Sequence, residues 1–411
     1  MPSIILSEGL PAGGSGQLAF IPMKYDDKLF TVALGGDGRV RIMNITDKTL
    51  TMIDDTQDSN ALTWRTRLID WKMKTNSTVI FRALHTRSGT LIIDRVEVDL
   101  STLTATRTEE STLNLSWLTD PNSIAHGIVI PPRLAVIPQW GGTANLHYVD
   151  LETGSDSYWN TGFGEYEPRA SQKIVVRNDD IYMLFGRHLN IDPYRYLKLY
   201  SQTFVELESP GGGSPRPQVG TISWFYNDLL FPATNGGVDG ADNDIFIYDD
   251  SFTKLGTIDL KGITGWTSND AMCGFTIYAK KSDGGYYMLL GIMDSSEADA
   301  TRYRLYHVEL DSTFSVVSSS MLFERDWKYV AVNMNSDYTD WNNVPILDHN
   351  TKKMYIVGSY RDVSEATSYS WIAEIDLSDI WDNVAEWNKS MWHIGVLGKI
   401  PTILSLTVTP L

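Results

Sequence analysis

The sequence predicts an all-β protein, a seven-bladed β-propeller of four-stranded antiparallel blades with an extra terminal strand. Segments with period-two alternation end in an apolar residue, run into a polar turn and continue into a second β-prone run. This pattern recurs at spacings of 53, 51, 50, 48, 61 and 67 residues, and its markers are Ile45, Val98, Val149, Leu199, Ile247, Val308 and Ile375. A β-repeat of about fifty residues cannot bury its own faces, so its copies pack on one another around a central channel.

Each marker belongs to the third strand of a blade, because further apolar runs precede it. The runs "QLAFIPM" and "KLFTVAL" stand before Ile45, and similar pairs stand before most other markers. Alternation, frequent β-branched and aromatic residues, and 32 glycines are typical of strands joined by turns. The one helical candidate is "SDIWDNVAEWNK". A solenoid or a pair of β-sandwiches is the alternative architecture.

The repeat sets the predicted boundaries. Residues 1–390 form one propeller domain, and residues 391–411 form an apolar C-terminal strand or arm. The predicted blades cover residues 14–53, 60–108, 122–160, 172–208, 218–259, 271–318 and 328–390. Either residues 2–7 or the C-terminal run supplies the closing strand of the ring, and the other terminal strand is then surplus.

The C-terminal run is predicted to serve assembly. Its apolar residues are Ile403, Leu404, Leu406 and Val408. Full burial of each such side chain gains about 1.5 to 3 kcal/mol, so the run is costly to leave in water. We expect it to add a strand to a sheet edge of a neighbouring subunit or protein partner. The alternative is that it packs beneath its own propeller.

One unit, "RLAVIPQWGGTANLHYVDLETGSDSYW", resembles a kelch repeat. The resemblance is carried by Gly141, Gly142, Tyr148, Asp150 and Trp159. Diglycines also occur at 35–36 and 236–237, so about three of the seven units match. A diglycine allows the chain to leave a strand through positive φ without a Cβ clash. The resemblance implies a propeller of kelch type but no particular family, and kelch propellers include both enzymes and interaction modules.

Composition narrows the classes of partner. Thirty-four basic against 51 acidic residues leave a net charge of −17, and no basic patch stands apart, so we expect neither nucleic acid nor an anionic membrane surface as ligand. The start of the chain has no basic and apolar leader, and no apolar stretch is long enough to span a membrane. These features fit the cytoplasm or the surface of a large assembly such as a virion.

Aromatic and acidic loops are the candidate binding sites. The blade-to-blade loops carry Trp117, Trp159, Phe163, Tyr166, Trp266 and Trp327. Flat rings beside carboxylates suit a sugar, whereas packing between blades is the structural alternative for each ring. Asp239, Asp242 and Asp244 could together hold Ca²⁺, but their spacing is not that of an EF-hand, and a solvated acidic turn is the favoured explanation. No cofactor is expected otherwise.

Catalytic motifs are weak. The seven histidines are dispersed without metal-ligand spacing, and the sequence contains no nucleophile elbow, P-loop or dinucleotide fingerprint. The favoured function is therefore a non-catalytic propeller for binding or assembly, contacting a protein or glycan through one loop face. The alternative is a carbohydrate-active enzyme of glycosidase or sialidase type that uses carboxylates near the channel mouth.

Overall fold

The structure is a computed structural model of the 411-residue chain. It describes residues 2–11, 19–34, 40–53, 67–87, 90–118, 127–130, 133–139, 145–161, 168–177, 180–187, 195–198, 201–206, 223–234, 244–260, 263, 270–294, 302–332, 345–362 and 368–395.

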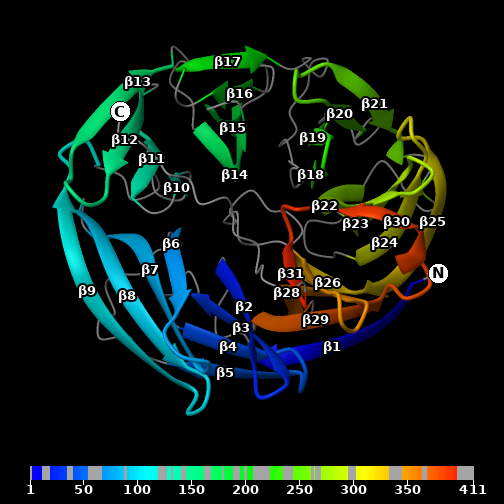
Figure 1. Cartoon of the computed structure of the whole chain (residues 1–411), viewed down its shortest axis with the longest axis horizontal. Helices are drawn as coiled ribbons and strands as arrows, with labels where there is room; N and C mark the ends of the chain where they lie inside the picture. Colours follow the sequence, from blue (N-terminus) through cyan, green and yellow to red (C-terminus); the bar gives the residue numbers. More distant parts are fainter. Residues whose placement is uncertain are drawn as a thin grey trace.

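Antiparallel sheets arranged as a ring form the fold (Figure 1). Five of the sheets in the described residues have four strands each, with the first strand innermost and the fourth outermost. They are β2 (Ala19–Tyr25), β3 (Lys28–Leu34), β4 (Val40–Asn44), β5 (Thr49–Ile53); β6 (Arg67–Met73), β7 (Thr78–Arg87), β8 (Thr90–Asp99), β9 (Thr104–Asn114); β10 (Ile128–Ile130), β11 (Leu134–Pro138), β12 (Asn145–Asp150), β13 (Asp156–Asn160); β14 (Pro168–Arg177), β15 (Asp180–Arg187), β16 (Arg195–Lys198), β17 (Thr203–Glu206); and β18 (Ser223–Trp224), β19 (Leu229–Thr234), β20 (Ile245–Tyr248), β21 (Lys254–Ile258).

Two further sheets are larger. One contains β22 (Asp270–Lys281), β23 (Tyr286–Asp294), β24 (Tyr303–Leu310) and β25 (Val316–Arg325), with β30 (Val384–Trp387) added to β22. The other, here called the closing blade, contains β26 (Trp327–Val332), β27 (Ile346–Asp348), β28 (Lys353–Asp362), β29 (Ser368–Asp376), β1 (Ser3–Pro11) and β31 (Trp392–Ile394). The prediction of an all-β propeller of four-stranded antiparallel blades is confirmed, and the two larger sheets depart from its regular pattern.

The sequence markers lie at the third strands. Val98, Val149, Ile247, Val308 and Ile375 lie in β8, β12, β20, β24 and β29. Ile45 directly follows β4, and Leu199 lies outside the described residues. All six described markers are fully buried, because a third strand has neighbouring blades on both faces.

An aspartate recurs where the third strand runs into its turn, and its hydrogen bonds explain why. Asp99 Oδ1 accepts the backbone N–H of Ser101, and Asp311 Oδ1 accepts those of Thr313 and Ser315. A residue in each turn adopts positive φ, as at Leu103 (52°). A short acidic side chain that bonds to the backbone two residues onward stabilises such a turn. The sequence repeat is therefore a repeat of turn chemistry.

Both chain ends take part in closing the ring. β1 pairs with β29 from Ser3 opposite Asp376 to Pro11 opposite Tyr369, so an N-terminal strand is the outermost strand of the closing blade. β31 pairs in parallel with β27, and β30 pairs with the end of β22. The predicted C-terminal arm began at residue 391, but its described part, 391–395, belongs to the closing blade. The candidate helix "SDIWDNVAEWNK" contains only a 3-10 turn, η2 (Trp381–Asn383), followed by β30.

The segment from β30 to β31, here called the clasp (Val384–Gly395), joins three sheets through a buried asparagine. Asn388 is fully buried; its Nδ2 donates to the carbonyl of Ile277 at 2.8 Å, and its Oδ1 accepts the N–H of Trp224 at 3.2 Å. His393 Nε2 contacts the Asn388 carbonyl oxygen at 2.9 Å. One side chain thus links β22, β18 and the segment that leads into β31.

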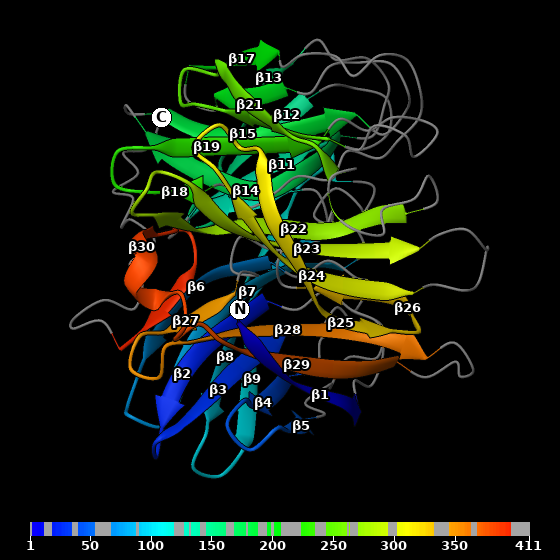
Figure 2. The same cartoon turned by 90° about the vertical axis from the view of Figure 1, so that its right-hand side faces the viewer.

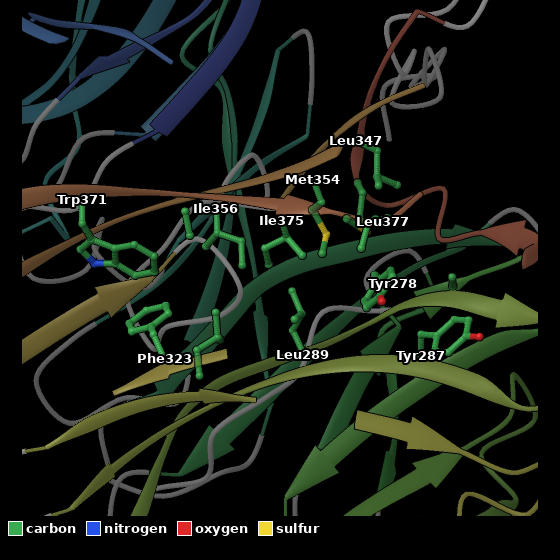
Figure 3. Packing of buried hydrophobic residues seen from close by; sticks show 14 of the residues in the cluster. Tyr278, Tyr287, Leu289, Phe323, Leu347, Met354, Ile356, Trp371, Ile375 and Leu377 are labelled. Carbon is green, nitrogen blue, oxygen red and sulfur yellow. The ribbon is translucent and has the colours of Figure 1, made fainter. Parts of the chain in front are cut away.

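The largest apolar cluster fills the space between the β22–β25 sheet and the closing blade (Figure 3). Trp371 and Phe323 face each other there at a ring distance of 5.8 Å, and Leu289 faces Ile375 (Figure 3). Facing apolar side chains of adjacent blades bury what each sheet alone would expose. No helix in the part of the chain that the structure describes has the length and hydropathy to span a membrane.

Candidate binding site

The predicted ligand-binding aromatics have different environments. Trp117 and Trp159 are half-buried. Trp327 is only 4% exposed and stacks on Tyr360 at a ring distance of 4.2 Å. Trp327 therefore lies in the core between the β22–β25 sheet and the closing blade, where it packs and has no surface for a ligand.

The other predicted site residues are mostly outside the described residues. These are Phe163, Tyr166, Trp266, Asp239, Asp242, Ile403, Leu404, Leu406 and Val408. The diglycines of the kelch-like units also lie outside them, so that resemblance stays a prediction. Asp244 is half-buried at the start of the segment that leads into β20.

Trp117 belongs to a group that we call the rim cluster, made of Trp117, Gln139, His147, Asp156 and Tyr158. A turn after β9 carries Trp117 onto the next blade, and the N–H of Leu118 donates to the carbonyl of Leu115 at 3.0 Å. Leu115 and Leu118 are 7% and 1% exposed and anchor this turn in the core between the two blades. The indole of Trp117 is thereby held over β12.

Strand register places the other members of the rim cluster. His147 of β12 pairs with Tyr158 of β13, and Asp156 is two residues before Tyr158 on the same strand. Directly paired residues, and residues two apart, share one face of a sheet. The three side chains therefore lie on the face that Trp117 covers, whereas Trp159 lies on the opposite face.

The geometry of the cluster is tightly constrained. Trp117 stacks on His147 at a centroid distance of 3.7 Å and an interplanar angle of 15°, and its Nε1 donates to Asp156 Oδ2 at 2.7 Å. The other oxygen of Asp156 lies 3.0 Å from His147 Nδ1, and His147 Nε2 lies 3.2 Å from Gln139 Oε1. His147 is 4% exposed, whereas Tyr158 is 62% exposed.

Electrostatics determine what this cluster can do. Burial lowers the pKa of His147, and the Asp156 carboxylate partly opposes the shift. The Asp–His pair resembles part of a catalytic relay, but Nδ1, Nε2 and one ring face already contact Asp156, Gln139 and Trp117. The arrangement fixes aromatic rings in place and leaves no free imidazole nitrogen to act as a base.

Sequence reasoning found part of this cluster. It predicted Trp117 as a ligand-binding residue but did not single out His147, Asp156 or Gln139. The one sequence signal was alternation on β13, which places Asp156 and Tyr158 on the same face as the paired histidine. The stacking of Trp117 from a preceding blade had no sequence signal, because it depends on how the blades are placed.

The other described histidines also make structural contacts. His85 Nε2 lies 2.9 Å from Asp94 Oδ2, His307 Nε2 lies 2.6 Å from Tyr278 Oη, and His349 Nε2 lies 2.9 Å from His393 Nδ1. Burial lowers the pKa of His307 and of His393 to about 4. Within the described ranges, no three or more metal-ligating side chains gather into a site for an ion.

Sequence comparison finds no relative: no family model matches the chain, and no curated protein does. Solved structures show distant similarity. The WD40 domain of SCAP from fission yeast is 11% identical, with a TM-score of 0.41 over 91% of this chain and 98% of that one. The β-propeller domain of Cps50 (Swd1) from Myceliophteria thermophila is 9% identical, with a TM-score of 0.41 over 90% and 100%.

An enzyme is also among the similar structures. A mutant of the apocarotenoid oxygenase from Synechocystis is 12% identical, with a TM-score of 0.41 over 73% of this chain and 71% of that one. At such scores and identities, none of these likenesses bears on function.

Proposed function

We propose that the chain is a non-catalytic propeller that binds a protein partner through the rim cluster and takes part in a larger assembly. The observation that supports it is that His147 stacks on Trp117 and also contacts the ring of Tyr158, which is 62% exposed. Pre-organised aromatic side chains lose little conformational entropy on binding and are enriched among residues that dominate interface energy. The rim cluster is thus built as a binding anchor.

The internal contacts of the polar groups favour a protein over a sugar. Both Asp156 oxygens and both His147 nitrogens already have protein partners, which reduces the number of acceptors left for the hydroxyl groups of a sugar. The cluster also contains a single carboxylate, whereas glycoside hydrolysis uses a pair. Glycan binding and hydrolysis are therefore outcomes that the test must separate from the proposed role.

The proposal keeps the ring of seven blades that the repeat predicts, as a single domain, and assigns the apolar run at residues 400–411 to assembly. A role on a large assembly such as a virion fits the acidic composition and this uncharged run. The kelch-like units fit the same architecture.

The test compares two exposed tyrosines. Tyr158→Ala removes the exposed ring of the rim cluster, and Tyr226→Ala removes a ring that is 71% exposed on the β18–β19 turn. Proteins retained by the parent chain and by Tyr226→Ala, but lost by Tyr158→Ala and Trp117→Ala, would support the proposal. The same variants go onto a glycan array and into a hydrolysis assay with labelled oligosaccharides. Turnover abolished by an Asp or Glu substitution would overturn it in favour of an enzyme.

A further inference from the structure

Three neighbouring outer strands, β21, β25 and β1, carry exposed aliphatic side chains. Val317 and Met321 of β25 are 59% and 52% exposed, Ile5 of β1 is 58% exposed, and Leu255 of β21 is 47% exposed. We call these four residues the apolar wall. Figure 2 views the ring from this side, with β21, β25 and β1 following one another from top to bottom.

Contacts between the strands place β21 and β1 on either side of β25. A Cβ at Gly256, next to Leu255, would lie 2.7 Å from the carbonyl oxygen of Thr313, so β21 packs directly against the turn that leads into β25. At the other end of β25, Arg325 Nε donates to Glu8 Oε2 of β1 at 2.9 Å. Leu255 therefore lies near the start of β25, and β1 lies beside its end.

Strand alternation explains why Ile5 and Met321 are exposed. Ile4 and Leu6 pack on the core cluster beneath, so Ile5 between them points outward. Leu322 packs on that same cluster, and Met321 before it points outward. The two side chains point away from the cluster between the β22–β25 sheet and the closing blade, so each is exposed on the outer face of its own sheet.

The wall also has an open backbone edge. β25 and β1 are the last strands of their sheets, and in the described residues neither pairs with a further strand. β25 is ten residues long, and charge appears on it only at its end, in Glu324 and Arg325. Long, weakly charged edge strands with apolar side chains are templates for strand addition.

We propose that the apolar wall receives the C-terminal run of a second copy, residues 402–409, as an added strand along β25. This inference rests on the proposed role in assembly. The run "TILSLTVT" carries no charge, and from Leu404 onward its apolar residues alternate with Ser405, Thr407 and Thr409. Its eight residues fit along the ten of β25. An uncharged strand with one apolar face matches an uncharged edge with exposed aliphatics.

Sedimentation velocity tests the proposal. The full chain should associate reversibly, and deletion of residues 400–411 should leave a monomer. Val317→Glu and Met321→Lys each place a charge on the wall and should raise the dissociation constant about tenfold or more, as for loss of a central interface contact. Thr108→Glu places a charge on the exposed face of β9, opposite Arg95, and should leave association unchanged.

Crosslinking identifies the occupant. With Cys273 replaced by serine, a chain carrying Met321→Cys is mixed with one carrying Leu406→Cys under mild oxidation. A disulfide between the two chains supports the proposal. A disulfide formed only within one chain that carries both substitutions, or a monomeric full chain at every concentration, overturns it. If truncation abolishes association but the wall charges do not affect it, the assembly role stands and the wall assignment is wrong.

Discussion

β9 and β25 occupy the same outermost position in two sheets, yet their outward faces differ. The exposed positions of β9 are threonine, glutamate and asparagine, as in Thr106, Glu109 and Glu110. Those of β25 include Val317 and Met321. The turns that precede the two strands use the same aspartate chemistry, at Asp99 and Asp311. The comparison teaches that the repeat constrains backbone and core, whereas the outward face is free to carry function.

The apolar cores behind β25 and β9 should contribute similarly to the free energy of unfolding. Trp371→Ala removes a fully buried ring behind β25 (Figure 3), and Phe81→Ala removes one that is 2% exposed behind β9. We expect each to lower the free energy of unfolding by about 3 to 5 kcal/mol. Urea unfolding of the two purified variants measures this, and a negligible effect of Trp371→Ala would contradict the core assignment.

Acid should destabilise the folded state through two buried histidines, His307 of β24 and His393 of β31. Burial lowers the pKa of His307 and His393 from 6.5 to about 4, so between these values the unfolded chain binds more protons than the folded one. Stability is then retained above pH 6.5 and falls as the pH drops toward 4. The full loss is about 3 kcal/mol for each histidine.

Urea unfolding between pH 7.5 and 4.5 measures this slope. His307→Gln should flatten it, because glutamine takes up no proton in this range. A slope that is the same in the parent chain and in His307→Gln would show that the acid response arises elsewhere.

The turns at Asp99 and Asp311 should respond alike to loss of the aspartate. Hydrogen bonds from Ser101 hold the pKa of Asp99 below its usual range, and those from Thr313 do the same for Asp311. Asp99→Ala and Asp311→Ala should each cause a small fall in the midpoint of thermal unfolding, of similar size in both. Scanning calorimetry decides this, and a large fall in only one of them would show that the two turns are not equivalent.

Polar substitutions on the outward faces should have the smallest effect on folding. Val317→Ser on β25 and Thr108→Ser on β9 change exposed side chains, so each should alter the free energy of unfolding by within about 0.5 kcal/mol. The first should nevertheless weaken self-association and the second should not. A strongly destabilised Val317→Ser would mean that the wall is part of the core.

The sequence was sufficient to predict the repeat because the third strand of a blade is buried on both faces and ends in a fixed turn. Ile247 and Val308 could therefore be placed without a structure. The strand that closes the ring was harder to predict. In the sequence either chain end could supply it, and the pairing of β1 with β29 in the folded chain decides between them. The clasp had no sequence signal, since Asn388 satisfies groups from sheets distant in the chain.

The candidate sites show the same limit. Trp117 and Trp327 look alike in sequence, as aromatic residues after an outer strand, but one lies over a polar pair and the other lies in the core. Blade placement separates them, and alternation within one strand carries no information about it. The exposed face of β25 was not predicted either, because burial of an outer strand depends on what packs beyond it.

Hydrogen–deuterium exchange of the associated chain against its dissociated form tests the central claim most directly, that the outward face of β25 is an interaction surface and that of β9 is not. We predict slower exchange on association in Val316–Arg325 and Ser3–Pro11, and unchanged exchange in Thr104–Asn114. Protection confined to β9, or unchanged exchange in β25, would contradict the account.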